Sequence, residues 1–94
     1  MKELLAEFMP RFVTAARDRL ERSRTLLSGG QYRELERELH TLAGDAAMLG
    51  LPELAEMVRE CEIAARRGAE ISGEMPAMLD RLADAVEAAA AEHG

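Results

Sequence analysis

Apolar residues recur every three or four positions along most of the chain, and glycine or proline interrupts the recurrence at only a few points. This spacing is typical of helices that bury one face, and no segment shows the strict alternation of a half-buried strand. Gly29-Gly30, Gly50 and Gly68 follow the ends of three runs, and Pro52 stands at the start of another. Glycine after a helix and proline in its first turn are the usual boundary residues. The pattern therefore predicts an all-α fold.

The apolar runs indicate four long helices joined by short connections. They cover residues 12–28, 32–49, 52–65 and a last stretch from residue 75. A shorter run of Leu4, Leu5 and Phe8 comes before Pro10, which interrupts or kinks a helix. Short connections place successive helices antiparallel. We therefore expect residues 1–94 to form one domain, an up-down antiparallel four-helix bundle with a short N-terminal helix or a kinked extension.

Charge, hydropathy and cysteine content exclude several classes of protein. A net charge of −6 argues against nucleic acid as the main partner. No segment approaches the roughly 20 consecutive apolar residues of a membrane span, and the N-terminus lacks a signal-peptide pattern. The one cysteine, Cys61, has no partner for an internal disulfide, which is typical of a reducing compartment. We expect a cytoplasmic protein that binds neither nucleic acid nor a membrane.

The motifs that would give the chain an enzymatic activity of its own are missing. The sequence contains no cluster of metal ligands, no P-loop and no kinase nucleotide motif. The chain is therefore expected to need no metal or cofactor and to have no autokinase activity. Any such chemistry would have to come from a partner.

One predicted helix carries a feature that core packing does not require. In the segment ELHTLAGDAAMLG, residues 38–50, His40 is followed only by small residues on its own side of the helix. The apolar strip of this helix consists of Leu35, Leu39, Leu42, Ala46 and Leu49. On a wheel of about 100° per residue, His40 lies about 140° and Gly44 about 180° from the centre of that strip. Ala47 and Ala43 flank them at about 120° and 80°.

Gly44 is informative because glycine inside a helix costs up to about 1 kcal/mol relative to alanine. The leucine spacing continues through Gly44 without a break, so the local pattern does not ask for a glycine. A bare patch beside an exposed imidazole would let the backbone of another protein come close. A surface histidine beside a tolerated glycine is the simpler alternative.

The segment resembles the histidine-containing phosphotransfer (HPt) domain family. The core pattern of that family is His-x-Leu-Lys-Gly, then Leu-Gly, then a leucine on the next helix. The matching positions here are His40, Leu42, Gly44, Leu49, Gly50 and Leu54. Glu62 falls where many members carry a glutamate on the following helix. The likeness spans the whole chain as a helix pattern, and its specific part runs from His40 to Glu62.

The resemblance implies a phosphocarrier in a two-component phosphorelay. His40 would accept a phosphoryl group from a receiver aspartyl phosphate or a kinase and pass it to the receiver of a response regulator. Gly44 would give that receiver room to dock. A carboxylate would orient the ring, and Glu62 is the candidate that the resemblance supports. Glu36, one turn before His40 on the same helix, is the alternative.

One position departs from the family pattern. The usual lysine, three residues after the histidine, is Ala43 here. Arg59 and Arg37 are the candidates for a substitute cation near the phosphoryl group, because guanidinium groups bind phosphate oxygens well. Arg33, Ala43 and Ala47 complete the expected docking surface around Gly44. The predicted docking residues are thus Gly44, Ala43, Ala47 and Arg33.

Two alternatives to the phosphocarrier remain. Because alanine occupies the lysine position, the chain could be a docking module that binds receivers without accepting a phosphoryl group. It could also be a structural helical bundle that matches the family pattern by coincidence. For the phosphocarrier and for the docking module, the expected partner is a receiver domain of a response regulator or hybrid histidine kinase. No additional helix suggests a dimerisation element, so we expect a monomer.

Overall fold

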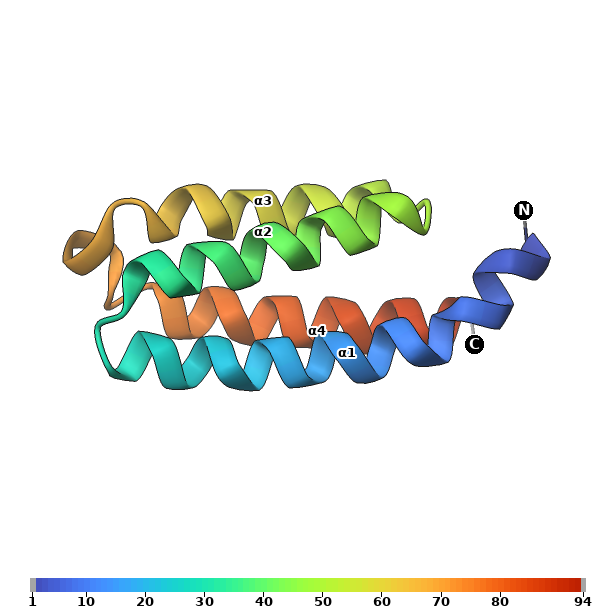
Figure 1. The fold of residues 1–94 in the computed structure, drawn as a ribbon, viewed down its shortest axis with the longest axis horizontal. Coiled ribbons are helices and arrows are strands. Elements are labelled where there is room, and N and C mark those ends of the chain that lie inside the picture. Colours follow the sequence, from blue (N-terminus) through green and yellow to red (C-terminus); the bar gives the residue numbers. More distant parts are fainter. Residues whose placement is uncertain (1, 94) are drawn as a thin grey trace.

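The computed structural model describes residues 2–93, with side chains described from Leu5 to His93. These residues form four α-helices, one 3-10 turn and no strand (Figure 1). The helices are α1 (Lys2–Ser28), α2 (Tyr32–Met48), α3 (Pro52–Ala65) and α4 (Met75–His93), and the 3-10 turn is η1 (Gly68–Ile71). The bundle measures 42 × 17 × 17 Å. The predicted all-α fold is confirmed.

The helices follow one another up and down around the bundle (Figure 1). Contacts join α1 to α2, α2 to α3, α3 to α4 and α4 back to α1, and the α2–α3 contact is the most extensive. This cyclic order is that of an up-down antiparallel four-helix bundle. It also brings the exposed edge of α2 beside the exposed edge of α3, which is where the candidate site lies.

The predicted ends of the first two long helices are confirmed. After α2, Gly50 adopts a φ of 77°, a conformation that glycine adopts without strain. The Gly50 amide donates to the Ala47 carbonyl, and the Leu51 amide donates to the Ala46 carbonyl. These two bonds satisfy carbonyls at the end of α2 and turn the chain sharply into α3.

The N-terminal extension is continuous with the first long helix. Pro10 lies inside α1, and the turns before it bend away from the axis of the rest of the helix (Figure 1). Proline removes a backbone donor and clashes with the preceding turn, which explains a bend at this point. Of the short apolar run before Pro10, Leu5 is half-buried and Phe8 is exposed, whereas Leu4 lies outside the described side chains.

The core is formed by the apolar strips of all four helices. On α2 the buried residues are Leu35, Leu39, Leu42, Ala43 and Ala46. Among the described side chains only two polar residues are buried as a whole, Ser23 and Glu62. The Ser23 hydroxyl donates to the Arg19 carbonyl one turn earlier, at 2.7 Å. Glu62 is therefore the one buried charged side chain in this part of the chain, and its partners lead to the candidate site.

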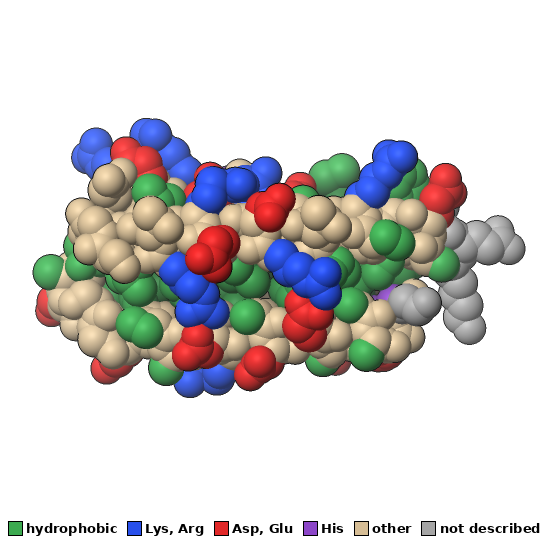
Figure 2. All heavy atoms as spheres, turned by 90° about the horizontal axis from the view of Figure 1, so that it is seen from below, with side chains coloured by type: hydrophobic (Ala, Val, Ile, Leu, Met, Phe, Trp, Pro, Cys, Tyr) green, Lys and Arg blue, Asp and Glu red, His purple; other side chains and the backbone are tan. Residues whose placement is uncertain are grey.

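Charged side chains on α1 and α4 meet across the seam between these helices (Figure 2). Arg17 donates two hydrogen bonds to Glu87, at 2.7 and 2.6 Å, and Arg24 donates to Asp80 at 2.7 Å. The hydrogen bond from Arg17 lowers the pKa of Glu87 below its ordinary value. Both pairs are solvent-exposed, so they fix the alignment of α1 and α4 more than they add stability.

Candidate functional site

His40 is held by one hydrogen bond to the neighbouring helix. Its Nδ1 atom lies 3.0 Å from Oε2 of Glu62 on α3, while 77% of the His40 side chain is exposed. A carboxylate can only accept, so Nδ1 carries the proton and donates it to Glu62. Nε2 then has a free lone pair and no partner among residues 2–93. In the neutral imidazole, the contact with Glu62 favours the tautomer that carries its proton on Nδ1 and leaves Nε2 accessible.

Glu62 lies at the edge of the α2–α3 interface with only 6% of its surface exposed. Its Oε2 atom accepts from His40 and also from Nη2 of Arg66, at 3.3 Å. Burying a carboxylate is costly unless charged or hydrogen-bonding partners compensate it. Arg66, one turn later on α3, supplies that compensation and leaves the other lone pair of Oε2 for the imidazole.

Arg66 also binds the carboxylate that was the alternative ring orienter. Its Nε atom donates to Oε1 of Glu36 at 2.7 Å, and this bond, followed by the charge of Glu36, raises the pKa of Arg66 above its ordinary value. Glu36 therefore contacts Arg66, and the carboxylate that contacts His40 is Glu62. Arg66 was not among the residues predicted for the site. Its position four residues after Glu62 was the available signal.

A shallow hollow surrounds His40 between α2 and α3. It is lined by Arg33, Glu36, Arg37, Thr41, Glu62 and Arg66 around the imidazole. Three arginines and two glutamates thus border the exposed ring, and the arginines are the groups that could balance an anion attached to Nε2. The hollow contains Arg37, predicted as a substitute cation, and Arg33, predicted as a docking residue.

Arg59 is exposed on α3 but does not line this hollow. As a candidate substitute cation, Arg59 was expected to lie near His40. The direction of the helices explains the difference, because α2 and α3 are antiparallel neighbours. The turn before Glu62 then lies beside the later part of α2, whereas the turn after it, with Arg66, lies beside Glu36 and His40.

The docking residues expected on α2 divide into exposed and buried positions. Gly44 and Ala47 are exposed, and a Cβ atom added at Gly44 would meet nothing within 4 Å. Nothing in the fold therefore requires a glycine there. The prediction that Ala43 contributes to the docking surface is wrong, because only 2% of its surface is exposed. Packing of α3 against α2 covers more of the α2 circumference than the leucine strip alone indicated.

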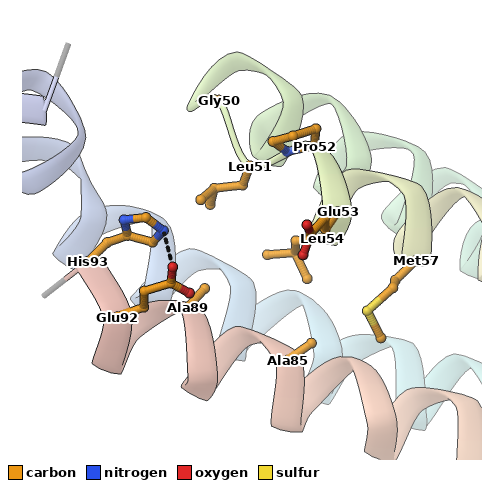
Figure 3. Close-up of a pocket in the computed structure, with 10 residues that line it drawn as sticks. All are labelled: Gly50, Leu51, Pro52, Glu53, Leu54, Met57, Ala85, Ala89, Glu92 and His93. Carbon is orange, nitrogen blue, oxygen red and sulfur yellow. Dashed lines mark ion pairs between the residues drawn. The ribbon is translucent and has the colours of Figure 1, made fainter.

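The second histidine is in a different setting. His93, at the end of α4, lies 4.0 Å from Glu92 in a hollow of about 270 Å³ that is lined largely by apolar residues (Figure 3). The apolar lining comes from the α2–α3 turn, the first turns of α3 and the end of α4. The one ion pair of His93 joins it to its own chain neighbour, so no carboxylate from another helix orients the ring.

The remaining candidate groups do not form a reactive centre. Burial raises the pKa of the Cys61 thiol to about 11, so this side chain is a neutral part of the core at neutral pH. Residues 2–93 contain no group of three side chains that could hold a metal ion. Within the same part of the chain, no helix is both long and apolar enough to cross a membrane.

Comparison with models of protein families shows which family the chain belongs to. A family model described as the Hpt domain matches residues 7–92, which is most of the chain. The chain belongs to the Hpt domain family. Neither a curated protein nor a solved structure gives a significant match. Hpt domains are phosphocarrier modules of two-component signalling that work with receiver domains, so this chain is a phosphotransfer module of that kind.

Proposed function

We propose that His40 is the phosphoacceptor of this Hpt domain, and that Glu62 orients its ring. The observation that carries the proposal is the 3.0 Å contact between His40 Nδ1 and Glu62 Oε2, which leaves Nε2 as the free nucleophile. The donor is an aspartyl phosphate on a receiver domain or a phosphorylated kinase domain, and the acceptor is the receiver of a response regulator. Receivers of this kind operate in the cytoplasm, where we place the chain.

The transfer step needs no proton to leave the ring. The lone pair of Nε2 forms a bond to phosphorus while the bond from phosphorus to the aspartyl oxygen breaks, and that carboxylate leaves with the electron pair. The phosphorylated imidazole keeps its proton on Nδ1 and gains positive charge. Glu62 faces that nitrogen and stabilises the charge. The reverse sequence with a second receiver returns the neutral imidazole.

The chain orients the His40 ring for transfer, and its partner contributes the rest of the chemistry. Phosphoryl transfer depends mainly on placing the attacking and leaving atoms in line and on balancing charge at the phosphoryl oxygens. The tautomer of His40 and the arginine-lined hollow serve these two purposes. Exposed Gly44, one turn after His40, leaves space for the partner's backbone.

The alternative is a docking module that binds receivers without accepting the phosphoryl group, because Ala43 replaces the family's lysine. Incubation with a radiolabelled phosphoryl receiver distinguishes the two. Our proposal expects acid-labile label to move from the receiver to this chain. Stable binding without any transfer of label would favour the docking module.

Arg66 is expected to be the principal substitute for the missing lysine. It lies in the His40 hollow and donates hydrogen bonds to two carboxylates, whereas Arg59 lies outside the hollow. We predict that Arg66→Ala lowers the phosphorylated fraction at equilibrium with a phosphoryl receiver by about fivefold or more, because a charge-assisted contact is lost. Arg37→Ala should lower it less, because Arg37 has no ion pair within residues 5–93 to hold its long side chain in place.

Arg59→Ala is the matched control on the same helix and should leave the phosphorylated fraction unchanged. A larger loss of the phosphorylated fraction in Arg59→Ala than in Arg66→Ala would contradict the role proposed for Arg66. Ala43→Lys would be a poor test of the role of Arg66, because position 43 is buried and a lysine there would disturb α2–α3 packing.

A further inference from the structure

Arg66 reaches from α3 toward α2 and contacts both glutamates of the His40 hollow. Its Nε atom donates to Oε1 of Glu36 at 2.7 Å, and its Nη2 atom donates to Oε2 of Glu62 at 3.3 Å. Glu62 belongs to the same helix as Arg66, whereas Glu36 belongs to α2, which lies beside α3 (Figure 1). The shorter contact is therefore the one that crosses between the helices and holds the guanidinium group beside α2.

These two contacts leave most of the donors of Arg66 free. A guanidinium group carries five N–H donors in a planar fork. Glu36 and Glu62 each accept from one of them, so three remain, two on Nη1 and one on Nη2. No residue from 5 to 93 accepts a hydrogen bond from Nη1. Neighbouring Nη1 and Nη2 donors are the pair that binds two oxygens of a phosphate at once. Arg66 can therefore bind a phosphoryl group on His40 and keep its present contacts.

The Arg66 side chain needs such a contact to stay in place, because 57% of it is exposed. A long side chain that is free in solvent loses conformational entropy when it binds a ligand. That loss is smaller when the side chain is already held in its binding position. The hydrogen bond to Glu36 is the largest cause that raises the pKa of Arg66 above its ordinary value. The contact between Arg66 and Glu36 thus orders the cation before a phosphoryl group arrives.

The charge of Glu36 has the opposite effect on the phosphorylated form. A carboxylate near His40 repels an anion attached to the ring. The Glu36 side chain is 30% exposed and its charge is paired with that of Arg66, so both the solvent and the guanidinium group weaken this repulsion. The two effects can be separated experimentally, because only the ordering effect requires Arg66.

We propose that Glu36 is a positioning residue, which holds Arg66 so that its free N–H groups meet the oxygens of a phosphoryl group on His40. Glu36 touches neither the ring nor the phosphoryl group. The bond from Nε2 to phosphorus still forms as the bond from phosphorus to the aspartyl oxygen breaks, and neither Glu36 nor Arg66 exchanges a proton or an electron pair. This inference rests on the proposed function, because it requires His40 to be the acceptor.

Glu36→Ala is expected to lower the equilibrium constant for phosphoryl transfer from a receiver about threefold, as losing one hydrogen bond does. The probe is a radiolabelled phosphoryl receiver that labels the parent chain, and the label on each partner is counted at equilibrium. Glu36→Gln should keep most of the parent value, because its amide oxygen still accepts from Nε of Arg66. Glu34→Ala is the matched control and should equal the parent. It removes the same charge from an exposed position of α2 outside the hollow.

The same substitution in a chain that already carries Arg66→Ala tests whether Glu36 acts through Arg66. Glu36→Ala should then cause no further loss, because the side chain that it positions is absent. An equal loss with and without Arg66 would overturn the inference. So would a Glu36→Ala variant that is phosphorylated as much as the parent or more, because repulsion by the carboxylate would then outweigh its ordering effect.

The parent chain separates failure of this inference from failure of the proposed function. A parent whose His40 takes no label from any phosphoryl receiver would contradict the proposed function. A labelled parent with an unchanged Glu36→Ala variant would contradict only the role of Glu36. Thermal melting checks the fold of each variant, which should persist because ion pairs with an exposed partner add little stability.

Discussion

A chain carrying His40→Gln is expected to accept no phosphoryl group from a phosphorylated receiver while keeping its fold. Glutamine has no nitrogen lone pair that can attack phosphorus. Its amide can still donate to Oε2 of Glu62, so the buried carboxylate keeps both of its partners. Because the His40 side chain is 77% exposed, the free energy of unfolding should change by no more than about 0.5 kcal/mol. Acid-labile radiolabel and urea unfolding measure the two quantities.

His93→Gln provides the matched control for this experiment. His93 is the other histidine of the chain, and its one ion pair joins it to its neighbour Glu92. This variant should be labelled like the parent. Label that persists on His40→Gln would show a different acceptor. A loss of more than about 2 kcal/mol of stability would show that His40 supports the core rather than the chemistry.

Glu62→Ala is expected to slow single-turnover transfer from a phosphoryl receiver by about ten- to hundredfold, the usual effect of losing a hydrogen bond to a charged group. Without the carboxylate, the His40 ring samples both tautomers and several orientations. The positive charge that the ring gains on phosphorylation also loses its counter-charge. Rapid-quench measurement of the transfer rate gives the result, and thermal melting checks that the variant folds.

Glu62→Gln distinguishes a positioning role from a merely structural one. The glutamine carbonyl oxygen can accept from Nδ1 of His40 in place of the carboxylate, so most of the transfer rate should return. Transfer by Glu62→Ala at the parent rate would contradict the role of Glu62. Equal slowing in both variants would assign the effect to the negative charge of Glu62 rather than to orientation of the ring.

The helices could be predicted from local features because each boundary has a local cause. Gly50 ends α2 in a conformation that glycine adopts readily, and Pro52 fits the first turn of α3. The three- and four-residue spacing on α2 likewise identified Leu35, Leu39, Leu42 and Ala46 as buried, whereas Leu49, predicted with them, is only half-buried. The bend in α1 was predicted only as one of two alternatives, because Pro10 can either end or kink a helix.

The site could be predicted less completely because it depends on how neighbouring helices pack. His40, Gly44 and Glu62 follow from the family pattern, and the structure brings His40 and Glu62 into contact. Burial of Ala43 depends on how far α3 extends around α2, which a helical wheel of α2 alone does not contain. The place of Arg66 in the hollow depends on the antiparallel register of α2 and α3.

A groove between the bent start of α1 and the end of α2 illustrates the same limit at longer range. Its two sides come from residues about forty positions apart in the chain, joined only by the bend in α1 and the packing of α1 on α2. Phe8 looks like a core residue in the sequence because it continues an apolar run. In the folded chain it is 41% exposed beside Met48. Its place in the groove becomes apparent only when the two helices are seen together.

The central claim is that Nε2 of His40 carries the phosphoryl group. The most direct measurement is an NMR spectrum of the chain with ¹⁵N-labelled histidine after phosphorylation by a receiver, which detects coupling between phosphorus and each ring nitrogen. We predict coupling to Nε2 of His40, with Nδ1 still protonated and hydrogen-bonded to Glu62, and no coupling to His93. Coupling to Nδ1 of His40, coupling to His93, or the absence of any phosphorus–nitrogen bond would contradict the claim.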